Sequence, residues 1–211
     1  MDYKGIIFDL DGVICFTDKY HYLAWKKMGE DEGIEVDESV NDRLRGVSRA
    51  ESLEIVLEKA KREYSPEEKK FLMEKKNNIY RDFLKTMTPA DVSDEVRNTL
   101  ENLRSRGFKL AIGSSSKNAK FILERVGMRD FFDAISDGEN IQRTKPDPQV
   151  FLMAADMLGL DPKTCVVVED AQAGIDAACA GGFGSAGLGP ARNYEKTQFP
   201  LDTFSDLLKI F

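Results

Sequence analysis

The sequence predicts an α/β fold: a doubly wound parallel sheet with an all-helical domain inserted after the first strand. A short apolar run at residues 4–8 is typical of a strand that is buried on both faces, and an acidic residue, Asp9, follows it. Apolar residues then recur at helical spacing from about residue 18 to 87. After Pro89 strand and helix patterns alternate, which implies right-handed crossovers and a parallel sheet with helices on both faces.

The inserted block contains two well-marked helix starts. Ser48 with Glu51 and Ser65 with Glu68 fit capping boxes, and Pro66 occupies the first helical position after Ser65. The block contains no convincing strand pattern, so we expect a separate helical domain. The expected domains are an α/β core at 1–16 and 89–211 and a helical cap at 17–88.

The second part of the core alternates regularly. We expect strands near 108–113, 132–135, 164–169 and 183–188, and helices near 92–106, 117–126, 148–158 and 171–180.

Composition and charge exclude several classes of protein. The 211 residues include 30 Lys and Arg against 37 Asp and Glu, a net charge of −7 that disfavours nucleic acids and anionic membranes as partners. The chain shows neither a secretory leader pattern nor a long apolar span, so we expect a cytoplasmic protein that does not enter a membrane. No apolar surface stripe is evident, which favours a monomer. Cys15, Cys165 and Cys179 form no CxxC pair, so we expect buried free thiols.

The carboxyl ends of the expected strands carry a cluster of polar residues. In parallel sheets this edge binds the ligand, and Asp9, Asp11, Ser114, Glu169 and Asp170 fall there. Four crowded carboxylates repel one another unless a cation intervenes. Oxygen ligands with no His or Cys nearby favour Mg²⁺.

The run after the second expected strand can bind an anion. Ser114 leads into Ser115-Ser116-Lys117-Asn118 and a helix start, where hydroxyls, backbone amides and an ammonium come together. Lys145 adds a second positive charge. These parts suit phosphoryl transfer, with Asp9 as the nucleophile and Asp11 as the general acid and base.

Four motifs resemble those of the haloacid dehalogenase superfamily: FDLDGV, the strand-end Ser114, Lys145 in TKPDP, and VVVEDAQAGI. The resemblance implies a Rossmann-like core with an inserted cap. It also implies that Asp9 is phosphorylated, that Ser114 and Lys145 hold the transferring phosphoryl group, and that Asp9, Asp11 (through its main chain), Glu169 and Asp170 bind Mg²⁺.

Segments of both the inserted cap and the core resemble the β-phosphoglucomutase family within that superfamily. The matching segments are Thr17-Asp18, His21, Trp25, LRGVSR at 44–49, KKNN at 75–78, TPAD at 88–91 and SSSKN at 114–118. This family interconverts β-glucose 1-phosphate and glucose 6-phosphate through a bound bisphosphate, so a sugar phosphate is the expected substrate.

The second resemblance also implies roles for the substrate-binding residues. Arg49, Ser116, Lys117 and Asn118 would bind the phosphate that is not transferred, and Gly46 and Val47 would place cap backbone against the sugar. Thr17, His21 and Lys76 would couple cap closure to the placement of Asp11.

Simpler interpretations remain open for three of these residues. His21 could be packed or solvated, Trp25 could be a core residue instead of a sugar contact, and Lys76 lies in a charged run that is typical of a solvated helix face. Two other functions also remain open: a sugar-phosphate phosphatase of the same superfamily, in which water discharges Asp9, and a non-catalytic phosphosugar-binding module.

Overall fold

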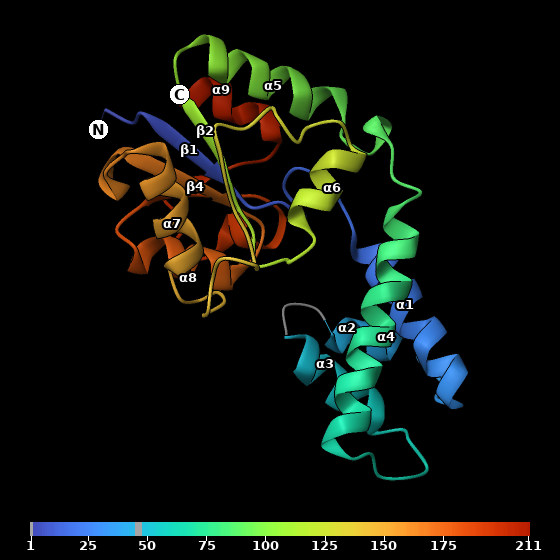
Figure 1. Cartoon of the computed structure of the whole chain (residues 1–211). Helices are drawn as coiled ribbons and strands as arrows, with labels where there is room; N and C mark the ends of the chain where they lie inside the picture. The colour runs from blue at the N-terminus through green and yellow to red at the C-terminus, as the bar shows by residue number, and fades with distance from the viewer. Residues whose placement is uncertain (1, 45–47) are drawn as a thin grey trace. The chain divides into compact units, whose positions relative to one another are not determined.

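The chain folds into two compact units in a computed structural model that describes residues 2–44 and 48–211 (Figure 1). One unit combines Met1–Phe16 with Met87–Phe211, and the other is Thr17–Thr86. We call them the core unit and the cap unit. The expected second boundary, after residue 88, lies two residues beyond this division.

The core unit contains one parallel sheet, and the prediction of a doubly wound parallel sheet is confirmed. The strand order is β3-β2-β1-β4-β5-β6. The strands are β1 (Gly5–Phe8), β2 (Lys109–Gly113), β3 (Ala134–Ser136), β4 (Cys165–Glu169), β5 (Gly184–Gly187) and β6 (Phe199–Pro200). Strand β6 was not expected from the sequence, because two residues are too few to form a pattern.

The sequences of the central strands are continuous apolar runs, because helices cover both faces of the sheet. All four residues of β1 are buried, and Ile7 pairs with Ala111 of β2 and Val167 of β4. Figure 1 shows α5 (Asp94–Ser105) and α9 (Leu207–Ile210) on one side, and α7 (Gln149–Leu158) and α8 (Gln172–Ala180) on the other. Helix α6 (Ala119–Arg125) connects β2 to β3. Short 3-10 helices cover Pro89–Asp91, Pro162–Thr164, Gly189–Asn193 and Phe204–Asp206.

All regular secondary structure in the described residues of the cap unit is helical. Its helices are α1 (Asp18–Glu32), α2 (Glu38–Arg43), α3 (Arg49–Leu57) and α4 (Pro66–Leu84). Both expected helix starts are confirmed: Ser48 Oγ accepts a hydrogen bond from Glu51 N, and Ser65 and Glu68 form a reciprocal capping box. Trp25, Met28 and Leu53 belong to the buried apolar cluster of this unit.

Within residues 2–44 and 48–211, no helix combines the length and the apolar character that a membrane span needs. The three cysteines are free thiols, but only Cys15 and Cys165 are buried, and the expectation of burial is wrong for Cys179.

The burial of β2 generates a stability prediction. Leu110 is fully buried, so Leu110→Ala removes apolar contacts and leaves a cavity, and we expect the free energy of unfolding to fall by about 2–5 kcal/mol. Leu152→Ala on α7 is the matched control, because this leucine is 38% exposed and should cost less than about 1 kcal/mol. Urea denaturation measures both variants, and equal losses would contradict the placement of β2 in the core.

Candidate active site

The carboxyl edge of the core sheet brings together side chains that are far apart in the sequence. Asp9 follows β1, Ser114 follows β2 and Glu169 is the last residue of β4. Backbone hydrogen bonds continue the ladder to this point, because Asp9 N donates to Val168 O at 2.9 Å and Ser114 N donates to Ser136 O at 3.0 Å. The backbone therefore fixes the positions from which these side chains leave the sheet.

Lys145 forms ion pairs with two carboxylates at this edge. Its Nζ lies 2.5 Å from Asp9 Oδ1 and also contacts Glu169 Oε1. The three side chains are only 12%, 10% and 1% exposed, respectively. Burial alone would lower the pKa of Lys145, but Asp9 and Glu169 outweigh it and raise that pKa above its usual value. Lys145 therefore supplies a permanent positive charge between the two carboxylates.

Backbone amides hold the other oxygen of Glu169. Glu169 Oε2 accepts hydrogen bonds from Asp170 N and Ala171 N, each at 3.0 Å. Burial raises the pKa of the Glu169 carboxyl, and the Lys145 ammonium opposes that shift. The carboxylate thus has fixed partners on both oxygens.

Two glycines make room for these carboxylates. A Cβ on Gly174, in the first turn of α8, would overlap the Glu169 carboxylate. A Cβ on Gly12 would overlap the Asp170 carboxylate, and Gly12 also has a φ of 87° in the tight turn after β1. A side chain at either position would displace a carboxylate, and the positive φ of Gly12 itself favours glycine.

Three carboxylates form a donor set that fits a hard divalent cation. One oxygen from each of Asp9, Glu169 and Asp170 lies within 4.8 Å of the other two. Burial, followed by the charges of Glu169, Asp9 and Asp11, raises the pKa of Asp170 to about 7. Such repulsion is what a cation relieves, and all-oxygen ligands suit Mg²⁺. The Asp11 side chain is not part of this three-residue set, so its expected contact with the metal, which is through the main chain, stays a prediction.

The segment after β2 forms two successive serine turns. Ser114 Oγ accepts a hydrogen bond from Ser116 N at 3.2 Å, and Ser116 Oγ accepts one from Asn118 N at 3.1 Å. Ser114 and Asn118 are each 3% exposed, whereas Lys117 is exposed. The turns therefore fix Ser114 at the carboxyl edge of the sheet and leave the Lys117 side chain toward solvent.

The cap unit brings together Thr17, His21 and Lys76, three of the residues singled out in its sequence. Lys76 Nζ lies 2.8 Å from His21 Nδ1. Tyr80 Oη donates a hydrogen bond to Thr17 Oγ1 at 3.0 Å. Lys76 is 3% exposed, so its interpretation as part of a solvated helix face is wrong.

The other cap residues predicted to bind substrate lie outside this group of three. Arg49 is the first residue of α3, and its Nη2 donates to Asn77 Oδ1 at 2.9 Å. Trp25 is 3% exposed within the apolar cluster of the cap unit, which accounts for its burial, and its contact with a sugar stays a prediction. The predicted sugar contacts of Gly46 and Val47 lie outside the described residues.

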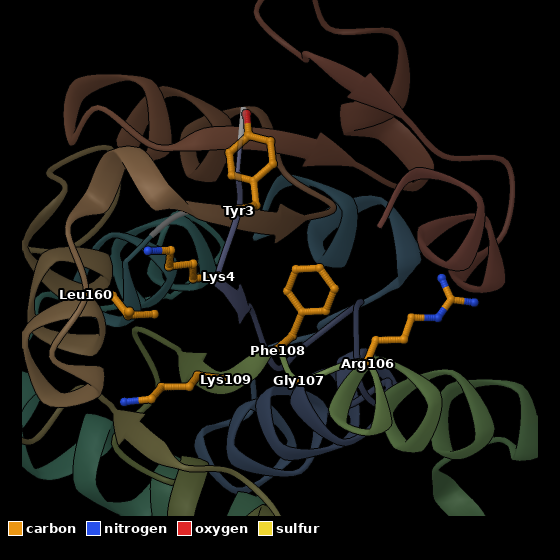
Figure 2. Close-up of a pocket in the computed structure, with 7 residues that line it drawn as sticks. All are labelled: Tyr3, Lys4, Arg106, Gly107, Phe108, Lys109 and Leu160. Carbon is orange, nitrogen blue, oxygen red and sulfur yellow. The ribbon is translucent and has the colours of Figure 1, made fainter.

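A concave region lies at the opposite edge of the core sheet, beside the amino ends of its strands (Figure 2). Lys4, Arg106 and Lys109 line it with Tyr3 and Phe108. Lys109 Nζ donates to Leu158 O and Arg106 Nη1 donates to Leu208 O, so two of the three cations bind carbonyl groups in or next to helices. This region has no carboxylate cluster and lies beside the amino ends of β1 and β2, so we do not assign the chemistry to it.

Comparison with known proteins agrees with the fold described above. Residues 3–182 match the family model described as haloacid dehalogenase-like hydrolase. A β-phosphoglucomutase of Bacillus subtilis is 43% identical over 88% of this chain and 83% of its own length. A phosphorylated carbohydrates phosphatase of Thermotoga maritima is 30% identical over 85% of this chain and 82% of its own length. The crystal structure of a β-phosphoglucomutase from Clostridium difficile superimposes with a TM-score of 0.86 at 39% identity, covering 97% of this chain and 93% of that one.

The chain therefore belongs to the haloacid dehalogenase-like hydrolase family, and the predicted membership is confirmed.

Sequence reasoning missed two kinds of residue. Gly174 lies within the VVVEDAQAGI motif, but a sequence does not show that the Glu169 carboxylate occupies the space beside it. Tyr80 follows Lys76 by one helical turn, and this i, i+4 spacing is the only sequence signal that links the two.

The close contact between Gly174 and Glu169 predicts the effect of a single methyl group. Gly174→Ala should displace the Glu169 carboxylate and weaken Mg²⁺ binding about 10–100-fold, as changes next to metal ligands commonly do. Isothermal titration calorimetry measures the affinity. Gln172→Ala, at an exposed position of the same helix, is the control and should bind as the parent does. Parental affinity in Gly174→Ala would contradict the proposed ligand set.

The raised pKa of Asp170 predicts a pH dependence for metal binding. In the metal-free protein this carboxyl is protonated below about pH 7, and the metal must displace that proton. Mg²⁺ affinity should therefore fall by up to about tenfold for each pH unit below 7 and level off above it. Titrations at several pH values test this, with Asp176→Asn on α8 as a control that keeps the dependence. A flat profile would contradict the proposal that Asp170 is a ligand.

Proposed function

We propose that this protein is a β-phosphoglucomutase, which interconverts β-D-glucose 1-phosphate and D-glucose 6-phosphate through a phosphorylated Asp9 and bound β-glucose 1,6-bisphosphate. The main support is the Lys145 ammonium between the buried carboxylates of Asp9 and Glu169. A phosphoryl group arriving at Asp9 would meet that positive charge. The 43% identity to a β-phosphoglucomutase supports the choice of substrate.

The reaction needs two phosphoryl transfers that share one carboxylate. An oxygen of Asp9 attacks phosphorus, the bond from phosphorus to the sugar oxygen breaks, and Asp11 gives that oxygen a proton. In the second transfer a sugar hydroxyl loses its proton to Asp11 and attacks the phosphoryl group on Asp9. The bond from phosphorus to the Asp9 oxygen breaks, and Asp9 leaves as a carboxylate. Lys145 and Ser114 stabilise the phosphoryl oxygens by charge and hydrogen bonding.

The carboxylate cluster is the proposed site of Mg²⁺. Asp9, Glu169 and Asp170 would hold the ion through side-chain oxygens. The resemblance to the haloacid dehalogenase superfamily adds Asp11 through its main-chain oxygen. When bound, Mg²⁺ offsets the negative charge of the carboxylates and of the phosphoryl oxygens.

A mutase must also hold a phosphate that it does not transfer. The bisphosphate intermediate carries phosphates at both ends, and either end must be able to react at Asp9. We assign the second phosphate to Arg49, Ser116, Lys117 and Asn118, and contact with the sugar to Gly46, Val47 and Trp25. A guanidinium can bind phosphate in a bidentate manner, so Arg49 is the side chain best suited to this role.

A sugar-phosphate phosphatase is the second candidate. Its support is the 30% identity to the phosphorylated carbohydrates phosphatase, which shares most of its length with this chain. In that reaction water, and not a sugar hydroxyl, attacks the phosphoryl group on Asp9. The two functions therefore share the core residues and differ in what reacts with the phosphorylated enzyme.

A paired assay distinguishes the two functions. Purified protein is given β-glucose 1-phosphate, Mg²⁺ and a trace of glucose 1,6-bisphosphate, and glucose 6-phosphate and free phosphate are followed together. We expect glucose 6-phosphate to form much faster than free phosphate, and Asp9→Asn to abolish both. Release of phosphate without isomerisation would favour the phosphatase.

The proposed role of Arg49 predicts a loss of activity that depends on the bidentate geometry of its guanidinium. Arg49→Ala should lower kcat/KM about 10–100-fold, because two charge-assisted hydrogen bonds to phosphate are lost, and Arg49→Lys should restore part of it. Arg43→Ala is the matched control: Arg43 pairs with Glu58 on the exposed surface of the same unit. If Arg49→Ala and Arg43→Ala had the same small effect, Arg49 would not be a phosphate ligand.

A further inference from the structure

Tyr80 contacts each of the three cap residues that the sequence analysis grouped together. Its side chain is 1% exposed and lies on α4, one turn after Lys76. Its Oη donates to Thr17 Oγ1 at 3.0 Å, and its ring stacks on that of His21 with the centroids 4.0 Å apart and the planes 24° from parallel. Lys76 Nζ lies 4.8 Å from the Tyr80 ring centroid. One buried side chain therefore joins Thr17, His21 and Lys76.

The Lys76 ammonium is buried, and a buried charge requires compensation. His21 Nδ1 lies 2.8 Å from it, and the ring centroids of Tyr80 and Trp25 lie 4.8 and 4.9 Å from it. Cation–π attraction to aromatic faces strengthens when water is excluded. The two rings therefore stabilise the Lys76 ammonium inside the cap unit.

The imidazole of His21 has a defined protonation state in this environment. Burial, Lys76 and Arg49 hold the pKa of His21 well below its usual range, so the ring is neutral near pH 7. An ammonium only donates hydrogen bonds, so Nδ1 is the acceptor and Nε2 carries the proton. The stacked Tyr80 ring fixes the plane in which this N–H lies.

We propose that Tyr80 is a positioning residue that fixes the Thr17 hydroxyl, the His21 ring and the Lys76 ammonium in one arrangement needed for turnover. The hydroxyl acts on Thr17, and the ring acts on His21 and Lys76. The effect on turnover rests on the proposed function, whereas the effect on the His21 ring does not.

The single histidine of the chain makes the test direct. NMR signals of the imidazole can arise only from His21, and a stacked aromatic ring shifts them upfield. We expect Tyr80→Leu to remove that shift and to let His21 titrate closer to pH 6.5, while Tyr80→Phe keeps the shift. Tyr64→Leu removes another tyrosine of the cap unit and should leave the signals of His21 as in the parent.

Steady-state kinetics test the role of Tyr80 in the reaction. Tyr80→Phe should lower kcat about fivefold, the effect of one lost hydrogen bond, with KM within about twofold of the parent. Tyr80→Leu should lower kcat further, and Tyr64→Leu should keep parental turnover.

Each result supports or overturns the proposal. Parental imidazole signals in Tyr80→Leu would show that Tyr80 only fills space. A parental kcat in Tyr80→Phe would overturn the role of the hydroxyl, and this variant decides the matter if Tyr80→Leu does not fold. If the parent shows no mutase activity, the proposed function fails, and the NMR comparison still decides whether Tyr80 positions His21.

Discussion

The site depends on one constraint: several carboxylates must lie within a few ångströms of one another at the edge of a sheet. Lys145 makes this possible by placing one charge between Asp9 and Glu169, and two backbone amides bind the remaining oxygen of Glu169. Gly174 leaves the space that this carboxylate fills. Parallel strands are also required, because only they bring the carboxyl ends of both β1 and β4 to the same edge of the sheet.

Much of the fold could be predicted because its elements follow local patterns. The apolar runs of β1 and β4 indicate strands buried on both faces, and Ser65 with Glu68 marks the start of α4 through contacts within four residues. Strand β6 could not be predicted, because its two residues pair with β5 only after the chain has folded. The exposure of Cys179 also depends on how α8 packs, which the sequence does not show.

The residues of the site likewise divide into those that the sequence could place and those that it could not. Asp9, Ser114 and Glu169 could be placed at one edge because strand ends in a parallel sheet coincide. Lys76 lies in a run of lysines that resembles a solvated face, and its burial results from packing against Trp25 and Tyr80. The raised pKa of Asp170 likewise arises from burial and from neighbours that the chain brings together over long distances. Residue type and spacing predict which groups react, and tertiary packing determines their charge and orientation.

The central claim is that Asp9, held beside Lys145, accepts the phosphoryl group. Rapid acid quenching during turnover, followed by peptide mass spectrometry, tests this directly, because an acyl phosphate adds a defined mass to one peptide. The account predicts a transient phosphoryl group on the peptide that contains Asp9, with none in Asp9→Asn. Turnover with no phosphoryl group on Asp9, or with the group on another residue, would contradict it.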